Sequence, residues 1–287
     1  MKKILFLTPE LPYPPISGGK LISWKLLQHL SNKYEVSVFC FLRDKDKFFL
    51  DEFREKVDLK ELFFEVMDKK RSIITYIMSI IRGVPLSIYR NYSFFFMNEV
   101  SEKLKLNRYD VILVDHYTMY QYVSENFKGK ILLNEHNAEY LIWERLSKNK
   151  DYNFLIRMLA LWESRRISKY EKIICMSSDK VLCVSSNDIK SLAKLGVNED
   201  KFELVATIGD DELLEFPDIE FEDTERSILF IGTLNWEPNV DGLLWFLRGC
   251  WKQLKKRFPA LKIYIIGANA DPRLVNLSKK DKDIILT

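Results

Sequence analysis

The sequence predicts an α/β protein built from two parallel-sheet domains, of which the second is incomplete. Two strand–glycine-loop–helix units carry this prediction, one at residues 2–31 and the other at residues 227–258. Elsewhere, short apolar runs alternate with stretches of helical periodicity, which is typical of a doubly wound fold. About 60 residues remain for the second domain, whereas a complete domain of this class usually needs about 100–150.

Apolar runs of four to six residues mark the expected strands. Because they are apolar at nearly every position, they are expected to be buried on both faces, as in a parallel sheet. The runs are Ile4–Leu7, Val36–Phe41, Val111–Val114, Ile131–Leu133, Lys180–Val184, Ile228–Ile231 and Lys262–Ile266.

The expected helices follow these strands at three- and four-residue apolar spacing. The first begins after Gly19 and carries Ile22, Leu26, Leu27 and Leu30 on one side. A longer one begins after Asn239, which we expect to be its N-cap, and another begins at Asp271-Pro272. An acidic stretch at 208–226 is expected to link an N-terminal domain (1–207) to a partial C-terminal domain (227–287).

Composition limits the class of protein. The chain has 287 residues, of which 47% are hydrophobic and 30% charged, with a net charge of +3 and mixed signs, so nucleic-acid binding is not indicated. The four cysteines form no C-x-x-C pair and are expected to be buried, reduced thiols of a cytoplasmic protein. No apolar run reaches 18 residues, so we expect no membrane-spanning helix.

One segment, residues 72–98, is rich in isoleucine and aromatic residues and is flanked by Lys69, Lys70, Arg71, Arg82 and Arg90. Core helices are the simpler interpretation. The alternative is an amphipathic surface that touches an anionic membrane or holds a lipid-linked substrate.

The loop after the first strand ends in Gly18-Gly19-Lys20 at the start of a helix. Glycines let the backbone approach a ligand, and free N–H groups at a helix N-terminus favour phosphate. Neither the P-loop pattern nor G-x-G-x-x-G is present, so a structural turn and a phosphate cradle both remain open.

Three histidines are the main titratable candidates. His116 and His136 each follow an expected strand, and ligands of open α/β sheets bind at the carboxyl ends of strands. A structural hydrogen-bonding role remains open for each of them. His29 lies within the first expected helix, at its surface or in its core.

Two D-x-D pairs, Asp44-Lys45-Asp46 and Asp281-Lys282-Asp283, resemble the motif of some metal-dependent sugar transferases. Both lie in lysine-rich polar stretches, so we interpret them as solvated loops. No H-E-x-x-H or G-x-S-x-G motif is present, and we expect neither a zinc site nor a serine-hydrolase triad.

Taken together, these segments resemble a family-4 retaining glycosyltransferase. The resemblance spans nearly the whole chain, and the order and spacing of its motifs are more specific than any one of them. It is carried by residues 14–19 (PPISGG), 109–112 leading to His116 (YDVI), 135–139 (EHNAE), 178–185 (SDKVLCVS) and 228–241 (ILFIGTLNWEPNVD).

The resemblance implies a GT-B-like fold, with two Rossmann-like domains and a nucleotide-sugar bound between them without an essential metal. The sugar would be transferred to a cell-surface glycan or lipid-linked acceptor, as in polysaccharide biosynthesis, by a cytoplasmic protein peripheral to the inner membrane face. The implied sites are catalytic His116; donor-binding Gly18, Gly19, Lys20, Gly232 and Asn235; and, as secondary candidates, His136, Asn137 and Glu139.

The chain departs from the family pattern in two places. Thr233-Leu234-Asn235 stands where many relatives have a basic residue, and the later motif of two glutamates is absent. We therefore expect a weakly active or inactive enzyme. The alternative is a non-catalytic remnant or interaction protein that needs a second chain for the donor site. A third hypothesis, which the residues above fit less well, is an epimerase of the same fold or a nucleotide-binding regulator.

Overall fold

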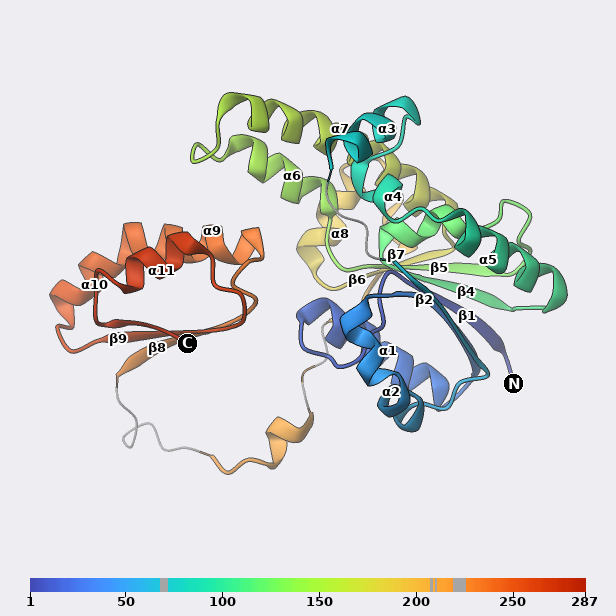
Figure 1. The fold of residues 1–287 in the computed structure, drawn as a ribbon, viewed down its shortest axis with the longest axis horizontal. Helices are drawn as coiled ribbons and strands as arrows, with labels where there is room; N and C mark the ends of the chain where they lie inside the picture. The colour runs from blue at the N-terminus through green and yellow to red at the C-terminus, as the bar shows by residue number, and fades with distance from the viewer. Residues whose placement is uncertain (68–71, 207–208, 210, 219–225) are drawn as a thin grey trace. The chain divides into compact units, whose positions relative to one another are not determined.

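The structure, a computed structural model, describes residues 1–67, 72–206, 209, 211–218 and 226–287 (Figure 1). The chain divides into two compact units, Met1–Ile208 and Gly209–Thr287, and each is described by itself. No helix within the described residues has the length and apolar character needed to cross a membrane.

Unit 1 is built on a seven-stranded sheet in which every neighbouring pair is parallel. The strand order is β3-β2-β1-β4-β5-β6-β7. The strands are β1 (Lys3–Thr8), β2 (Glu35–Leu42), β3 (Glu61–Val66), β4 (Val111–Asp115), β5 (Lys130–Glu135), β6 (Lys180–Cys183) and β7 (Phe202–Leu204). The α/β fold class predicted from the sequence is confirmed.

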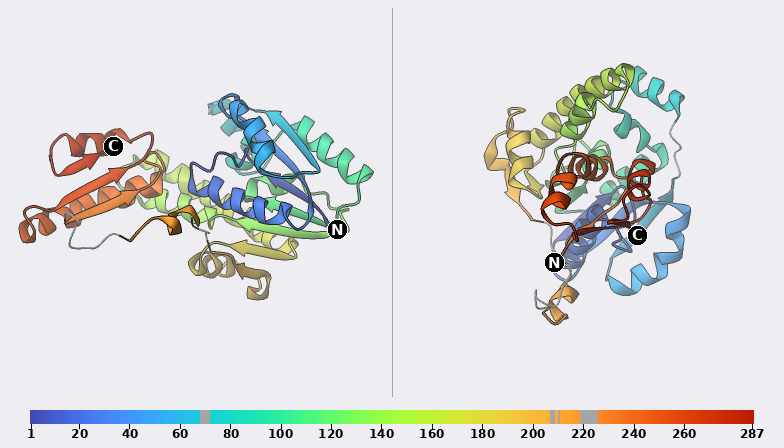
Figure 2. Two further views of the ribbon diagram at one scale, coloured as in Figure 1. Left: turned by 90° about the horizontal axis from the view of Figure 1, so that it is seen from below. Right: turned by 90° about the vertical axis from the view of Figure 1, so that its left-hand side faces the viewer.

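Helices cover both faces of this sheet (Figure 1 and Figure 2). On β1, Ile4 and Phe6 pack with α1 (Gly18–Ser31) and α2 (Leu50–Lys56), while Leu5 and Leu7 belong to the core on the opposite face. That second core contains α5 (Phe94–Leu106), α7 (Phe154–Ser177), α8 (Ser186–Ala193) and the 3₁₀ helix η2 (Tyr117–Tyr122). Burial on both sides explains the continuous apolar strands.

The remaining helices of unit 1 pack at the margins of these two layers. Helix α6 (Glu139–Lys148) pairs with α7 as a helical hairpin, and α3 (Ile73–Ile81) contacts α7 through the rings of Tyr76 and Trp162, 6.1 Å apart (Figure 1). Shorter helices are α4 (Leu86–Arg90) and the 3₁₀ helices η1 (Asp44–Phe49) and η3 (Glu199–Lys201).

The interpretation of residues 72–98 as core helices is wrong for α3. Its isoleucines are largely exposed, because the helix lies over α4 and α7 rather than on the sheet; they are Ile73, Ile74, Ile77, Ile80 and Ile81. The N-terminal half of α7 is also apolar and exposed at Phe154, Leu155, Met158 and Leu159. The basic residues 69–71 lie outside the described residues.

Unit 2 is a three-stranded parallel sheet in the order β10-β9-β8, with β8 (Ser227–Ile231), β9 (Lys262–Ile266) and β10 (Ile284–Leu286). One face packs on α9 (Glu237–Phe246), a π-helical turn (Leu247–Trp251), α10 (Lys252–Arg257) and α11 (Pro272–Ser278) (Figure 1). On the other face Leu229 and Ile231 are 59% and 70% exposed, so the described residues of the unit leave that face uncovered.

Several local expectations need correction or comment. The edge strands β3, β7 and β10 were not predicted, because β7 and β10 have only three residues and the apolar runs of β3 and β7 are interrupted by glutamates. Asn239 is not an N-cap: α9 begins at Glu237, and the Asn239 amide donates to Thr233 O at 3.0 Å. Asp271 does cap α11, with proline at its first position. Within the expected linker, Asp211–Glu215 forms a 3₁₀ turn, while residues 208, 210 and 219–225 lie outside the described residues.

Each of the four cysteines is free, with Cys40, Cys175 and Cys183 buried and Cys250 half-buried. Burial raises the pKa of the Cys40 and Cys183 thiols to about 12, which keeps them protonated and unreactive.

Candidate active site

The candidate site lies at the carboxyl edge of the unit 1 sheet, where the strand order reverses. From β1 the chain builds outward through β2 and β3, then returns to β4 and builds outward in the opposite direction. Connections leaving β1 and β4 therefore diverge, and a crevice opens between them. The Gly18-Gly19 loop follows β1, and His116 follows β4.

The first part of the site is the N-terminus of α1. The Ser17 hydroxyl accepts a hydrogen bond from the Lys20 N–H at 3.4 Å and caps the helix. A side chain at position 18 would meet open space, whereas a Cβ at position 19 would lie 3.5 Å from Nδ1 of His136. The helix N-terminus, with its partial positive charge, therefore faces the His136 ring.

His136 is held by a buried carboxylate, Asp115, at the end of β4. Nε2 of His136 lies 2.8 Å from Asp115 Oδ1, which also accepts from the Asn134 amide at 2.8 Å. The Thr8 hydroxyl donates to the other oxygen at 2.8 Å. Thr8 and Asn134 belong to β1 and β5, the strands on either side of β4, and His136 directly follows β5, so the parallel register brings all three to the end of β4.

The Asp115–His136 pair shifts the pKa of both groups towards their charged forms. Burial raises the pKa of Asp115, but the charge and hydrogen bond of His136 outweigh burial and leave the pKa lowered. Burial lowers the pKa of His136, and the Asp115 carboxylate outweighs that effect and leaves the pKa raised. The pair therefore favours the protonated form of the buried His136 ring beside α1.

His116 presents its ring next to this pair. Its backbone has a φ of 80°, a left-handed conformation that a non-glycine residue rarely adopts and that is frequent at functional sites. Nδ1 is 3.0 Å from the Thr118 hydroxyl, and Nε2 is 3.7 Å from Oε1 of Glu139. The ring meets that of His136 edge-on at 5.7 Å and remains partly exposed.

The secondary candidates Asn137 and Glu139 lie at the start of α6. The Asn137 amide donates to Glu139 Oε1 at 3.3 Å. Glu171, from α7, accepts the backbone N–H groups of Glu139 and Tyr140 at 2.6 and 3.0 Å, and so takes the place of an N-cap. Asp188, from α8, accepts the Ala138 N–H at 3.0 Å.

A group of acids lies beneath this helix start. Glu135 is fully buried, and neither carboxylate oxygen has a hydrogen-bond partner among the described residues. Burial, followed by repulsion from Glu171, Glu139 and Asp188, raises the pKa of Glu135 well above its ordinary value. Burial likewise raises the pKa of Glu171 to about 8. Burial and the neighbouring acids therefore favour the neutral form of Glu135.

Lys20 does not lie open at this edge. Its side chain is buried, and Nζ is 3.5 Å from Asp46 Oδ1, which is buried too. The interpretation of Asp44-Lys45-Asp46 as a solvated loop is therefore wrong for Asp46. The two opposite charges compensate each other, as burial requires, although Asp46 Oδ2 has no hydrogen-bond partner among the described residues.

In unit 2 the predicted donor residues follow β8. Gly232 donates its N–H to Ile266 O at 3.0 Å, and a Cβ there would lie 3.0 Å from the Asn239 amide nitrogen. Asn235 is exposed in the turn before α9. Nearby, Arg273 is engaged by Glu237 and Asp271, with nitrogen–oxygen distances of 2.8 and 2.9 Å.

The second D-x-D pair is likewise structural rather than a solvated loop. Asp281 Oδ2 accepts from the Trp251 indole at 2.7 Å, and Asp283 pairs with Lys255 at 2.7 Å. Within the described parts of the chain, no group of three histidine, cysteine or acidic side chains is arranged to hold a metal ion.

The comparison with protein families decides the classification. Residues 17–212 match the family described as Glycosyltransferase Family 4. The chain belongs to this family. Comparison with curated proteins finds no match.

Solved structures share the fold of this family-4 chain. The Anabaena protein Alr3699/HepE in complex with UDP matches with a TM-score of 0.52 and 13% identity, covering 98% of this chain and 64% of HepE. HepE in complex with UDP-glucose matches with a TM-score of 0.50 and 11% identity, covering 100% and 69%. This chain thus spans about two thirds of HepE, and the likeness confirms the GT-B fold.

Sequence reasoning missed part of the site of this family-4 protein. Asp115 was overlooked although it directly precedes His116, and a carboxylate at the end of a buried strand was the available signal. Glu171 and Asp188 gave no signal, because they reach the start of α6 from α7 and α8, which are distant in sequence.

Proposed function

We propose that the chain binds a nucleoside diphosphate sugar and transfers the sugar, with retention, to a hydroxyl of a glycan or lipid-linked acceptor. Family membership and the fold shared with HepE, which was solved with UDP and UDP-glucose, support the donor class. The observation that carries the proposal is the α1 N-terminus facing His136, which is held by Asp115, where the strand order reverses.

The diphosphate is assigned to the N-terminus of α1. The first N–H groups of a helix have no partner within it, and Gly18 leaves open space for a ligand to approach. The His136 ring lies behind Gly19, and its raised pKa favours the form that adds positive charge there. These groups stabilise the leaving diphosphate, and we propose that no metal is essential. Because Lys20 is paired with Asp46, a contact from Lys20 to the donor requires that pair to open.

His116 is assigned to the sugar near its reacting carbon. The bond from that carbon to the diphosphate breaks, the acceptor oxygen forms the new bond, and the nucleoside diphosphate leaves with the acceptor proton or releases it to solvent. Glu139 orients the His116 ring across 3.7 Å. Gly232 and Asn235 are assigned to the donor from unit 2.

The experiment is a titration with UDP and a panel of UDP-sugars, followed by sugar-transfer and donor-hydrolysis assays. His116→Ala is expected to lower turnover by on the order of 10²-fold with an unchanged fold. His29→Ala, which removes an exposed histidine from α1, is the matched control and should leave turnover unchanged. Equal turnover in both variants would remove His116 from the mechanism.

We also propose that unit 1 touches the inner face of the cytoplasmic membrane through α3 and the N-terminal half of α7. The support is their contiguous exposed apolar residues, among them Ile74, Ile77 and Phe154. Ile74→Asp should abolish co-sedimentation with anionic vesicles. Leu106→Asp, at an exposed leucine at the end of α5, should not. Binding unaffected by Ile74→Asp would exclude this surface.

A second candidate function is a protein–protein interaction, in which another chain completes the donor side. The uncovered face of the unit 2 sheet, with Leu229 and Ile231, favours it. Turnover that appears only when a second polypeptide is added, and that Leu229→Asp removes, would support this function over an enzyme acting alone.

A further inference from the structure

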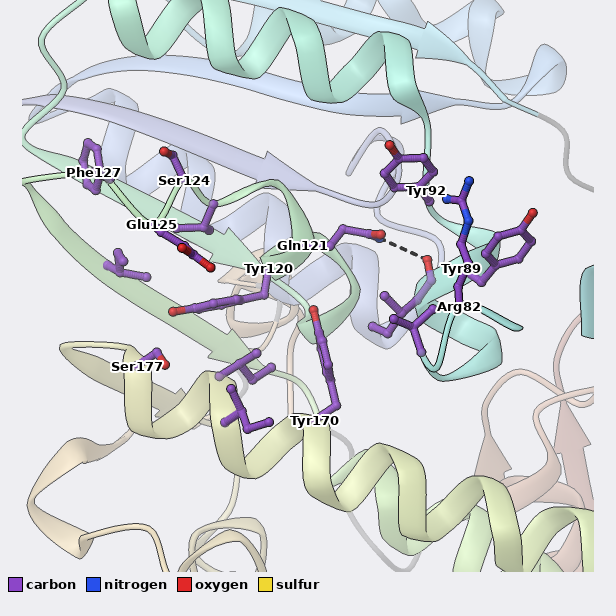
Figure 3. A pocket seen from close by; sticks show the side chains of 16 residues that line it. Arg82, Tyr89, Tyr92, Tyr120, Gln121, Ser124, Glu125, Phe127, Tyr170 and Ser177 are labelled. Atoms are coloured by element: carbon purple, nitrogen blue, oxygen red, sulfur yellow. Dashed lines mark hydrogen bonds between the residues drawn. The ribbon is translucent and has the colours of Figure 1, made fainter. Parts of the chain in front are cut away.

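A cavity of about 760 Å³ lies in unit 1, on the face of the sheet covered by α7 and η2 (Figure 3). It is lined from three directions: by α7, by the chain from η2 to the start of β5, and by residues 82–92. Ile131 and Ser177, which line it, lie near the amino ends of β5 and β6, whereas the candidate active site lies at the carboxyl edge. The cavity is therefore a separate site.

Two aromatic rings separate the cavity from the active site. Tyr170 lines the cavity, and its ring lies 6.4 Å from that of Tyr117. The Tyr117 ring lies 4.7 Å from that of His116 on the other side. A ligand in the cavity is thus close enough to affect His116 through packing, but it is not placed to react there.

The interior of the cavity is mainly apolar. Ile88 and Ile174 are buried at its wall, 2% and 1% exposed, and further apolar side chains complete it. These are Val84, Val123, Phe127, Ile131 and Ile173. A volume of this size falls in the range of small-molecule sites, roughly 300–1,000 Å³.

Part of the polar lining is already used within the protein. The Gln121 amide donates to Ile88 O at 3.1 Å and to Thr118 O at 2.7 Å, as Figure 3 shows in part. The Ser124 hydroxyl accepts from the Asn126 N–H at 3.3 Å. A sugar would leave many of its hydroxyls without partners in such a lining, and burying them costs free energy.

Two polar groups distinguish the cavity from a plain apolar void. The exposed Arg82 guanidinium lies over the rings of Tyr89 and Tyr92, at 5.4 and 5.1 Å, and these three side chains form one end of the lining (Figure 3). The Tyr170 hydroxyl is buried and has no hydrogen-bond partner among the described residues. An apolar ligand with an oxygen-bearing neck and an anionic head would match both groups.

We propose that this cavity binds a hydrocarbon chain of an anionic phospholipid, with the headgroup phosphate at Arg82 and an ester oxygen accepting from the Tyr170 hydroxyl. The membrane is the source, because Arg82 caps the C-terminal end of α3, whose exposed isoleucines continue the apolar surface. This site extends the membrane contact proposed above, but binding of a monomeric lipid needs no membrane surface.

The test is calorimetric titration of the whole chain with dihexanoyl phosphatidylglycerol below its micellar concentration. Saturable binding of one lipid per chain is expected. Dihexanoyl phosphatidylcholine should bind about tenfold more weakly, because it lacks the net negative charge that pairs with Arg82. Glycerophosphoglycerol, which has the headgroup but no chains, should not bind. Equal affinity for both lipids would overturn the role of Arg82.

Variants locate the site. Arg82→Gln should weaken binding about tenfold, and Tyr170→Phe by a smaller factor. The substitutions Val123→Trp and Ile131→Phe each fill the cavity and should abolish lipid binding. Two variants are used because either substitution can disturb the fold. Circular dichroism checks that each variant is folded. Arg54→Gln, at an exposed arginine on α2 across the sheet, is the control and should bind normally.

The outcomes also separate this site from the proposed function. Phosphatidylglycerol binding that survives both folded cavity-filling variants, or occurs only on vesicles, would overturn the proposal. UDP affinity measured on the same variants should be unchanged, since the cavity lies outside the active site. Loss of lipid binding with UDP binding intact is therefore the expected result.

Discussion

The two units of this chain use the same kind of sheet but cover it differently. In unit 1, the chain moves outward from β1 in one direction and then, from β4, in the other. Parallel connections are right-handed, so these two directions place helices on opposite faces. In unit 2, β8, β9 and β10 are added in one direction only, and the helices that pack on this sheet, α9 to α11, lie on one face.

This difference explains where each unit can bind a ligand. A reversal of strand order opens a crevice at the carboxyl edge, and unit 1 has its reversal between β1 and β4. The polar groups of the site gather there, around Asp115, His116 and His136. The described part of unit 2 has no reversal, so its distinctive surface is an apolar sheet face instead.

The largest difference is expected from leucine truncations in the two sheets. Leu7→Ala, at a fully buried position of β1, should lower the free energy of unfolding by about 2–5 kcal/mol. Leu229→Ala, at an exposed position of β8, should change it by less than about 0.5 kcal/mol. Urea unfolding at several protein concentrations measures both. A large, concentration-dependent cost for Leu229→Ala would show that a second copy covers the face.

Glycines in unit 2 provide the next test. A Cβ at position 267 would lie 1.8 Å from Gly232 O, so Gly267→Ala should force the two loops apart and cost about 1–3 kcal/mol or more. Gly242 in α9 has nothing within 4 Å of the same atom, and Gly242→Ala should stabilise the helix by about 0.4–1 kcal/mol. Thermal unfolding compares them, and equal effects would mean the loops are not in contact.

The sequence allowed the central strands and the edge that carries both histidines to be predicted. Apolar runs identify buried parallel strands, and His116 and His136 each follow such a run, so each was predicted to lie at the carboxyl end of a strand. Edge strands such as β3 contain glutamates and carry a weaker signal. The surroundings of α3 could not be predicted, because periodicity shows that a helix has an apolar side but not whether anything covers it.

The hydrogen-bond and ion-pair partners of the site residues were harder to predict than the place of these residues in the fold. Glu171 reaches the α6 N-terminus through a helical hairpin, and Lys20 finds Asp46 across the loop after β2. Such contacts depend on packing between elements far apart in sequence. Local pattern therefore predicted where polar residues gather, while the pairing that sets their charge required the structure.

The buried acids predict how stability depends on pH. The pKa of Glu171 is about 8 in the folded chain and near 4.5 in the unfolded chain, so the folded state holds more protons between these values. The free energy of unfolding should therefore fall as pH rises from 4.5 to 8, by at least about 1 kcal/mol. The raised pKa of His136 acts in the same direction. The stability that protonated His136 contributes is lost as the pH rises through the pKa of this group in the folded chain.

Glu171→Gln isolates the contribution of this acid, because His136 is common to both proteins. The variant should be less stable than the wild type at pH 5. The two oxygens of Glu171 accept the N–H groups of Glu139 and Tyr140, whereas an amide has only one acceptor oxygen. Its stability should decline less between pH 5 and 8. Denaturant unfolding across this range measures the slopes, and identical slopes would exclude Glu171 as the titrating group.

The smallest effect is expected at two helix caps, one beside the active site and one away from it. Ser17 caps α1 and Ser72 caps α3, each through its hydroxyl, so either alanine substitution should cost about 1 kcal/mol of stability. Only Ser17→Ala alters the N-terminus that faces His136, so only that variant should weaken UDP binding. Calorimetry with UDP distinguishes them. Equal UDP affinity in both variants would mean that the diphosphate does not bind at α1.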